Sequence, residues 1–169
     1  MALRIVASCV LASSLALGAG LCAAAPAAPD KFLTEAIQDG RAEIEICKVA
    51  LRKSKSADVK EFAQRMIKEH SEINDKVEAL AKGKGITLKA GISAKQKATN
   101  EMLSHTPEAR FDKAFMDHNV SDHKKDVEDF GKQANEAADG DVKAFAAETL
   151  QILKKHLQLA EDVGAKLKE

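Results

Sequence analysis

Apolar residues recur at alternating steps of four and three along four long segments of this chain. The segments cover about residues 31–53, 57–82, 107–137 and 141–163. Steps of four and three return to the same side of an α-helix, so each segment predicts an amphipathic helix. Four such helices, each with a continuous apolar seam, are typical of a coiled-coil-like four-helix bundle. The sequence therefore predicts an all-α fold.

Short polar segments separate these helices and supply their ends. Ser56 and Asp141 are expected to cap the second and fourth helices, and Thr106-Pro107 predicts the start of the third. Residues 83–105 contain glycines that interrupt the helical pattern, although residues 93–103 could form a short helix. One long connection between the second and third helices is the arrangement of ferritin-like four-helix bundles. The spacing also permits an up-and-down bundle with an elaborated loop.

The first 28 residues have the pattern of a secretory signal peptide. A short basic start ends at Arg4, an uncharged apolar run covers residues 5–21, and small residues follow it. Cleavage is expected at about residues 24–28, which leaves the bundle as a domain of residues 30–167 without a transmembrane segment. This interpretation predicts a periplasmic protein.

Two other interpretations of this N-terminus remain open. A lipid-anchored protein would need a leucine three residues before Cys22 and a small residue directly before it, whereas Ala19 and Leu21 stand in the reverse order. An uncleaved anchor is compatible with the length, because residues 5–29 carry no charge and could span a bilayer. The content of alanine, glycine and serine favours cleavage.

Composition narrows the classes of function. The chain is 45% hydrophobic and 31% charged, which suits a helical bundle and excludes a disordered polymer. Its formal net charge is zero and no basic stripe is interleaved with aromatic residues, so we expect no nucleic acid partner. Two of the three cysteines lie in the expected signal peptide. The mature chain then keeps Cys47 alone and forms no internal disulfide.

Four polar residues of the predicted helices fall at one height of the bundle. Glu43 and His70 lie at similar distances from the turn at residues 54–56, and His123 and His156 lie at similar distances from the turn at residues 139–141. Antiparallel neighbours joined by short turns bring such pairs to one level. In the second, third and fourth helices, the histidine is the one strongly polar residue on the predicted inner stripe. These residues predict either a metal site or a polar core layer.

As a metal site, three imidazoles and one carboxylate would suit a single Zn, Cu, Fe or Mn ion better than Ca or Mg. Nearby polar residues that could orient these ligands are Asp39, Asn74 and Asp126. Cys47 lies one turn after Glu43, so it is either a further ligand or a buried core residue. As a polar layer without metal, the same side chains would fix the register of the helices.

Two further polar residues are expected to point away from this layer. His118 lies about 140° around its helix from His123, toward an outer groove or the long connection. Glu69 directly precedes His70 and points about 100° away from it, so it could reach the rim of the layer, although a surface position is favoured.

Several sequence runs resemble one known family. Residues 40–44, 59–70, 111–112, 120–123 and 153–157 are together similar to the bacterial exported domain-of-unknown-function family 4142, over about residues 31–165. The resemblance implies a ferritin-like four-helix fold and a periplasmic or envelope location, and members are often described as outer membrane proteins. It implies no established activity. The family's recurrent glutamate and three histidines correspond to Glu43, His70, His123 and His156.

The pattern differs from that of ferritins and di-iron enzymes. Those proteins bridge two irons through paired Glu-x-x-His motifs. Here the residues three positions before the histidines are Ile67, Val120 and Leu153, so the bridging carboxylates are missing. Iron storage and di-iron oxygen chemistry are therefore not expected, and a mononuclear site remains open.

Three hypotheses about function follow. The first is a metal-binding bundle that senses, buffers or transports one transition-metal ion. The second is a structural or stress-related interaction bundle with a metal-free polar layer and an envelope protein as its partner. The third is a mononuclear metal oxidoreductase, which would have no tyrosine or tryptophan as a radical partner. The sequence has no G-x-S-x-G elbow, phosphate-binding glycine loop or H-E-x-x-H motif, so no catalytic residue is assigned.

Overall fold

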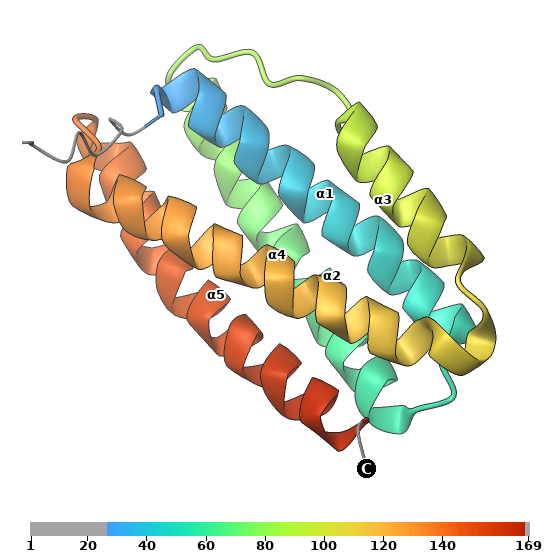
Figure 1. The fold of residues 1–169 in the computed structure, drawn as a ribbon. Helices are drawn as coiled ribbons and strands as arrows, with labels where there is room; N and C mark the ends of the chain where they lie inside the picture. Colours follow the sequence, from blue (N-terminus) through green and yellow to red (C-terminus); the bar gives the residue numbers. More distant parts are fainter. Residues whose placement is uncertain (1–26, 168–169) are drawn as a thin grey trace, which may run out of the picture.

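The computed structural model describes residues 27–167, which form five α-helices and no β-strand (Figure 1). The helices are α1 (Pro29–Lys53), α2 (Ala57–Gly83), α3 (Ala94–His105), α4 (Glu108–Glu136) and α5 (Gly140–Lys166). The prediction of an all-α, ferritin-like four-helix bundle with a long connection is confirmed. The short helix expected within that connection is α3. The expected signal peptide, residues 1–28, lies almost entirely outside the described residues.

The helix ends follow the predicted capping chemistry with small shifts. Ser56 caps α2, where its hydroxyl accepts a hydrogen bond from the backbone N–H of Val59. The cap of α5 is Asp139 rather than Asp141, because the Asp139 carboxylate accepts from the backbone N–H groups of Asp141 and Val142. The cap of α4 is Pro107 rather than Thr106, without a side-chain hydrogen bond.

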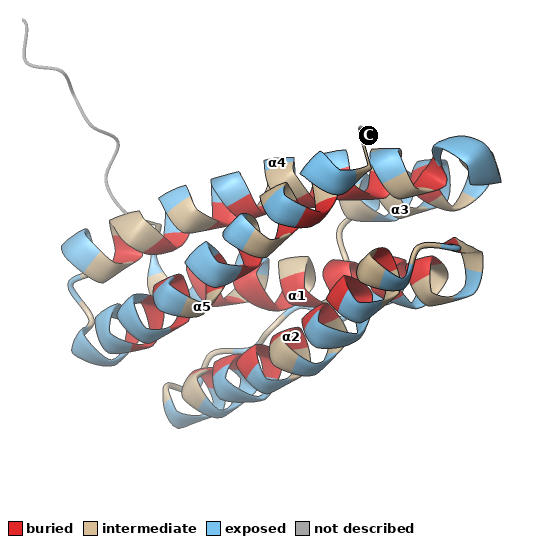
Figure 2. Ribbon diagram, turned by 90° about the horizontal axis from the view of Figure 1, so that it is seen from below, coloured by how far each residue is buried: buried red, intermediate tan, exposed pale blue. Residues whose placement is uncertain are grey.

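Two helical hairpins form the bundle, and their buried faces meet. Helices α1 and α2 pack together, as do α4 and α5, while α2 also packs against α5 and α1 against α4. Helix α3 lies outside the four-helix arrangement, alongside α1 (Figure 1). Buried residues line the sides of the helices that face the interior of the bundle (Figure 2). Within residues 27–167, no helix combines the length and the apolar character that crossing a membrane requires.

The core consists of two apolar clusters, one toward each end of the bundle. Large members of the first cluster are Leu33, Ile37, Phe130 and Phe145. Large members of the second are Phe62, Met66, Phe111 and Phe115. A buried polar residue lies between the two clusters on each of the four long helices: Glu43, His70, His123 and His156. The polar residues therefore occupy the middle of the bundle, as the turn counting predicted.

The inner face of α1 differs from the one that the apolar spacing predicted. That spacing placed Glu43 at the edge of a stripe made of Leu33, Ile37, Gly40, Ile44, Cys47 and Leu51. Ile44 and Leu51 are only half-buried, whereas Glu43, Ile46 and Ala50 are buried. The face is rotated so that Glu43 lies on it rather than at its edge. A charged residue type thus occupies a position from which water is excluded, and it needs a protein or ligand partner there.

Helix α4 also buries polar residues, whereas the hydrophobic pattern placed Val120 and Val127 on the inner face beside His123. Asn119, Asp126 and Gln133 are buried, while their neighbours Val120 and Val127 are half-buried. The expectation that histidine is the one polar residue on this stripe was wrong for α4. The amide of Asn119 donates to the Phe115 carbonyl at 3.0 Å, and that of Gln133 donates to the Ala27 carbonyl at 3.0 Å. These bonds reduce the penalty for burying the two amides.

Helix α3 is attached to α1 mainly through polar contacts. Its N-terminus has a reciprocal capping box between Ser93 and Gln96. Leu103 is its one buried residue. The Gln96 amide donates to the Asp39 carboxylate, and the Asn100 amide donates to the Ala42 carbonyl at 2.9 Å. Polar attachment of this kind indicates that α3 covers a polar region of α1 rather than an apolar one.

Candidate metal centre

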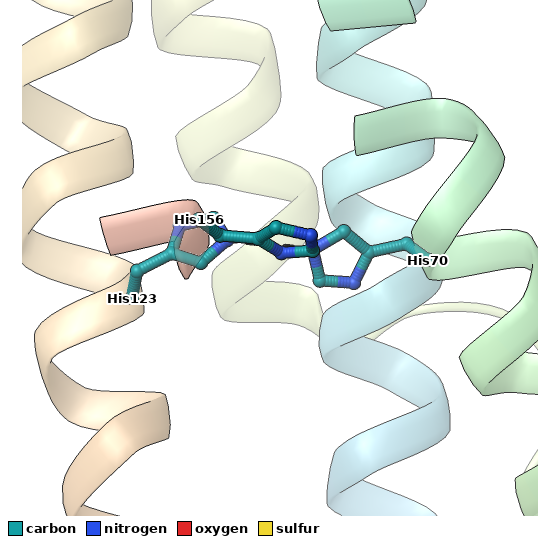
Figure 3. Close-up of side chains that lie close together, drawn as sticks. All are labelled: His70, His123 and His156. Carbon is teal, nitrogen blue, oxygen red and sulfur yellow. Dashed lines mark hydrogen bonds between the residues drawn. The ribbon is translucent and has the colours of Figure 1, made fainter. Parts of the chain in front are cut away.

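His70, His123 and His156 point at one another from α2, α4 and α5 in the middle of the bundle (Figure 3). Their ring centroids are 5.2 to 5.6 Å apart. One ring nitrogen of each histidine lies within 4.8 Å of those of the other two, and all three side chains are buried. The structure thus brings together the three histidines that the sequence placed at one level.

A backbone carbonyl sets the protonation of His123. Its Nδ1 lies 2.9 Å from the carbonyl oxygen of Asn119. A carbonyl oxygen only accepts hydrogen bonds, so Nδ1 carries the proton. In the neutral ring, Nε2 is then unprotonated, and it faces Nε2 of His70 at 3.4 Å. His123 therefore presents a nitrogen lone pair to the middle of the cluster.

Glu69 sets the protonation of His156 in the same way. Nε2 of His156 lies 2.6 Å from Oε2 of Glu69, and Nε of Arg65 donates to the other carboxylate oxygen at 2.8 Å. Because an ionised carboxylate only accepts, Nε2 of His156 is the donor and its Nδ1 is unprotonated. That Nδ1 is buried and has no hydrogen-bond partner within residues 27–167. An orphaned lone pair of this kind suits a metal ligand.

The spacing of the first two imidazoles agrees with coordination of one ion. Two nitrogens at Zn–N distances of about 2.05 Å around a tetrahedral ion are about 3.3 Å apart. The Nε2 atoms of His70 and His123 are 3.4 Å apart. Without an ion, His70 can donate from Nε2 to the unprotonated Nε2 of His123. With an ion, the other tautomer of His70 would present a lone pair instead.

Burial keeps these imidazoles neutral. Desolvation, followed by the proximity of His123 and His156, lowers the pKa of His70 well below its ordinary value. Desolvation and then His156 lower the pKa of His123 to about 4. Desolvation also lowers the pKa of His156, although the hydrogen bond to Glu69 acts in the opposite direction. Neutral imidazole is the form that binds a metal ion, so all three rings are in the form that coordination would require.

Glu43, the fourth residue expected in this layer, does not belong to the histidine cluster. Its carboxylate instead lies with His118 and Asp122, within 4.8 Å of a ligand atom of each. The Cys47 thiol donates to Oε1 of Glu43 at 3.0 Å. Cys47 is thus a buried partner of Glu43, in agreement with the core interpretation of this cysteine.

The residues expected to orient the ligands lie elsewhere. Asp39 bonds to Gln96 of α3, and Asn74 packs against Gly40 of α1. Asp126 is buried close enough to Asp122 and Asp39 that desolvation and then these two charges raise its pKa well above the usual range. Among the described residues, none of the three forms a hydrogen bond with a histidine of the cluster.

The hydrogen bonds that orient the histidines come instead from Glu69, which bonds to His156, and from the Asn119 carbonyl, which bonds to His123. Glu69 was expected at the surface because it precedes His70 on the helix, yet it reaches His156 of another helix. Partial burial raises the pKa of Glu69, but hydrogen bonds and charges of His156 and Arg65 lower it overall. An Arg four residues before the Glu was the available signal in the sequence, since such a pair fixes the carboxylate on the helix surface.

Comparison with known families agrees with this fold. The model of one family, described as a domain of unknown function (DUF4142), matches residues 18–163. The chain belongs to DUF4142. The resemblance seen in the sequence is thereby confirmed, and this family assignment states no activity.

One solved structure with a similar fold is the crystal structure of a DUF305 fragment from Deinococcus radiodurans. The TM-score is 0.73 at 17% sequence identity, over 83% of the present chain and 99% of that chain. At this identity the similarity concerns the fold alone. No curated protein matches the sequence.

Proposed function

We propose that this DUF4142 member is an exported, periplasmic bundle that binds one transition-metal ion through His70, His123 and His156. The observation that carries the proposal is the orientation of the ring nitrogens. Asn119 and Glu69 each accept the N–H of one imidazole, which leaves Nε2 of His123 unprotonated and facing His70, and Nδ1 of His156 unprotonated, buried and without a hydrogen-bond partner within residues 27–167. Metal-binding histidines are oriented in this way in proteins.

The donor set favours particular metals. With Glu43 outside the cluster, the protein ligands are three neutral imidazoles, which suit zinc and copper better than manganese. Three protein ligands leave one position of a tetrahedral ion for water or a small molecule. A buried ion with one exchangeable position fits a protein that carries, buffers or senses a metal.

In the alternative of a metal-free polar layer, one ring nitrogen of His156 has no hydrogen-bond partner in the described part of the chain. A structural layer is stabilising only when each buried polar atom has a partner. Nδ1 of His156 has none among residues 27–167. An ion held between the three rings would satisfy this atom, and for this reason the metal hypothesis is preferred.

Metal content of the purified protein tests the proposal. The parent chain, purified without added metal and then titrated with Zn²⁺ or copper, should bind one ion per chain with high affinity. His123→Gln and His156→Gln should lose this ion. The matched control is His105→Gln, because His105 is exposed at the end of α3. A parent chain without a stoichiometric ion, or a His123→Gln variant that keeps it, would contradict the proposal.

Glu69→Gln tests the orienting contact separately. The change replaces the ionised acceptor of the His156 N–H by a neutral amide and should weaken metal affinity by about 10- to 100-fold. Glu72→Gln is the control, because Glu72 is exposed on the same helix. Equal affinities of Glu69→Gln and parent would show that Glu69 does not prepare His156 for the metal.

A further inference from the structure

A second polar region lies beside the histidine cluster, between α1, α3 and α4. It is a pocket of about 440 Å³, lined by Glu43 and Asp39 of α1, by Asn100 of α3, and by His118 and Asp122 of α4. The contacts of Gln96 and Asn100 hold α3 at the side of this pocket. His118 thus faces the long connection, as the helical geometry predicted.

Glu43 is a buried residue of the pocket lining, and one of its two carboxylate oxygens has no hydrogen-bond partner within residues 27–167. The side chain is 3% exposed, and its Oε1 is bonded to the Cys47 thiol. Its Oε2 is buried and has no hydrogen-bond partner within residues 27–167. A buried carboxylate oxygen that faces a polar pocket without a partner is costly unless a proton or a cation occupies its position.

Two side chains of α4, His118 and Asp122, offer further ligand atoms close to the Glu43 carboxylate. His118 and Asp122 are four residues apart on α4, so they lie one above the other on its surface. Together with Glu43, each contributes one ligand atom, and the three atoms lie within 4.8 Å of one another. Two carboxylates from two helices and one imidazole therefore converge, and the group shares no residue with the histidine cluster.

The charges around the pocket favour a cation. Asp39 and Asp126 lie close enough to Asp122 for their charges to interact. Four acidic residues line the pocket, Glu35, Asp39, Glu43 and Asp122, against two lysines, Lys95 and Lys125. Lys125 bonds to Asp129 at 2.7 Å, and its charge also acts on Asp39 and Asp126. The carboxylates therefore outnumber the lysines around the pocket.

We propose that this pocket is a second metal site, in which Glu43, His118 and Asp122 hold a divalent cation of the Mn²⁺ class. Two carboxylates favour a hard cation, and the imidazole favours Mn²⁺ over Ca²⁺ or Mg²⁺. The histidine cluster has only nitrogen donors and favours zinc or copper. The bundle would then hold two chemically different ions. Helix α3 would cover the site with the two carboxylates, because its residues line the pocket.

Titration with Mn²⁺, followed by electron paramagnetic resonance of free and bound ion, tests this site. The full purified chain is first stripped of metal with a chelator. We expect one bound Mn²⁺ per chain, and a loss of affinity of at least 10-fold in Glu43→Gln and in Asp122→Asn. Glu128→Gln removes one exposed acidic charge from α4 and should leave the affinity unchanged. His70→Gln should also keep the Mn²⁺ ion, because His70 belongs to the other cluster.

The possible outcomes separate the two sites. A parent chain that binds no Mn²⁺, or a Glu43→Gln variant that binds it like the parent, would overturn the second site. Loss of Mn²⁺ in His70→Gln with retention in Asp122→Asn would place the ion at the histidines and also overturn it. His118→Asn changes a half-buried side chain at the pocket wall. It should lower the affinity as well, and it provides the same test should Glu43→Gln fail to fold.

Discussion

Burial affects the two kinds of titratable residue in the middle of the bundle in opposite directions. It lowers the pKa of His123 to about 4 and raises the pKa of Glu43 to about 8. Both groups are thus neutral in the metal-free folded chain near neutral pH. The unfolded chain protonates the histidine at about pH 6.5 and ionises the glutamate at about pH 4.5. Acid therefore destabilises the fold through His123, whereas base destabilises it through Glu43.

Glu43→Gln isolates the second of these effects. Between about pH 4.5 and 8, the unfolded parent releases a proton that the folded parent keeps, so the parent loses stability as the pH rises through this window. The glutamine of this variant cannot ionise, and it keeps an acceptor for the Cys47 thiol. The variant should therefore gain stability relative to the parent, by up to about 1.4 kcal/mol for each pH unit of the window. Denaturant unfolding at pH 5 and pH 8, with chelator present, measures this difference.

Glu128→Gln is the control for that experiment, because Glu128 is exposed on α4. It should differ from the parent by the same small amount at both pH values. A difference between Glu43→Gln and parent that does not change with pH would contradict a raised pKa of Glu43.

Periodicity predicted which histidines point inward but not which groups orient them. His70, His123 and His156 each occupy a position that apolar neighbours define at steps of three and four. The contacts of Glu69 with His156 and of the Asn119 carbonyl with His123 depend on side-chain reach and on the angle between helices. Neither quantity is encoded in the spacing of a single helix, so these two contacts could not be predicted.

At the scale of the elements, the sequence predicted the helices correctly, but it did not predict exactly which residues of each helix are buried. In α4 the residues at 116, 119, 123, 126, 130 and 133 are buried, which is the same four-and-three pattern with polar residues at several of its positions. Hydrophobicity alone assigned Val120 and Val127 to the inside. The true face contains Asn119 and Asp126, and the Asn119 carbonyl bonds to His123 on the same face. Polar residues thus occupy inner positions of α4 that the hydrophobic pattern assigned to neighbouring apolar residues.

The close contact between α1 and α2 at Gly40 gives a prediction at this scale. A Cβ atom at residue 40 would overlap the side-chain oxygen of Asn74 on α2, which is itself a buried residue. Gly40→Ala should therefore destabilise the chain by about 1 to 3 kcal/mol, although alanine favours helix formation. Thermal or denaturant unfolding measures the change.

Gly131 provides the matched control for Gly40. It lies within α4, and a Cβ there would meet no atom within 4 Å. Gly131→Ala should stabilise the chain by up to about 1 kcal/mol through helix propensity. Adding Asn74→Ala should restore much of the stability that Gly40→Ala removes. Equal effects of the two glycine substitutions would show that α1 and α2 do not meet closely at Gly40.

At the scale of the molecule, both polar sites connect the two halves of the fold. The histidine cluster joins α2 of one hairpin to α4 and α5 of the other. The pocket joins α1 of the first hairpin to α4 of the second, with α3 beside it. The sequence predicted the bundle, the long connection and the level of the polar layer, because these depend on helix length and turn position. It could not predict that Glu43 and the histidines separate into two groups, because this depends on how the hairpins are rotated.

Since the histidines come from both hairpins, an ion bound to them should stabilise the whole bundle. A ligand that binds only the folded state adds about 2.7 kcal/mol at 100 times its dissociation constant, which for a domain of this size corresponds to a rise in Tm on the order of 10 °C. We expect Zn²⁺ to raise the Tm of the chelator-treated parent by this amount, and to raise that of His105→Gln equally. His70→Gln should lose most of the increase, because one of the three ligands and the link to α2 are removed. An equal Zn²⁺ shift in His70→Gln and parent would mean that the metal does not connect the hairpins through this cluster.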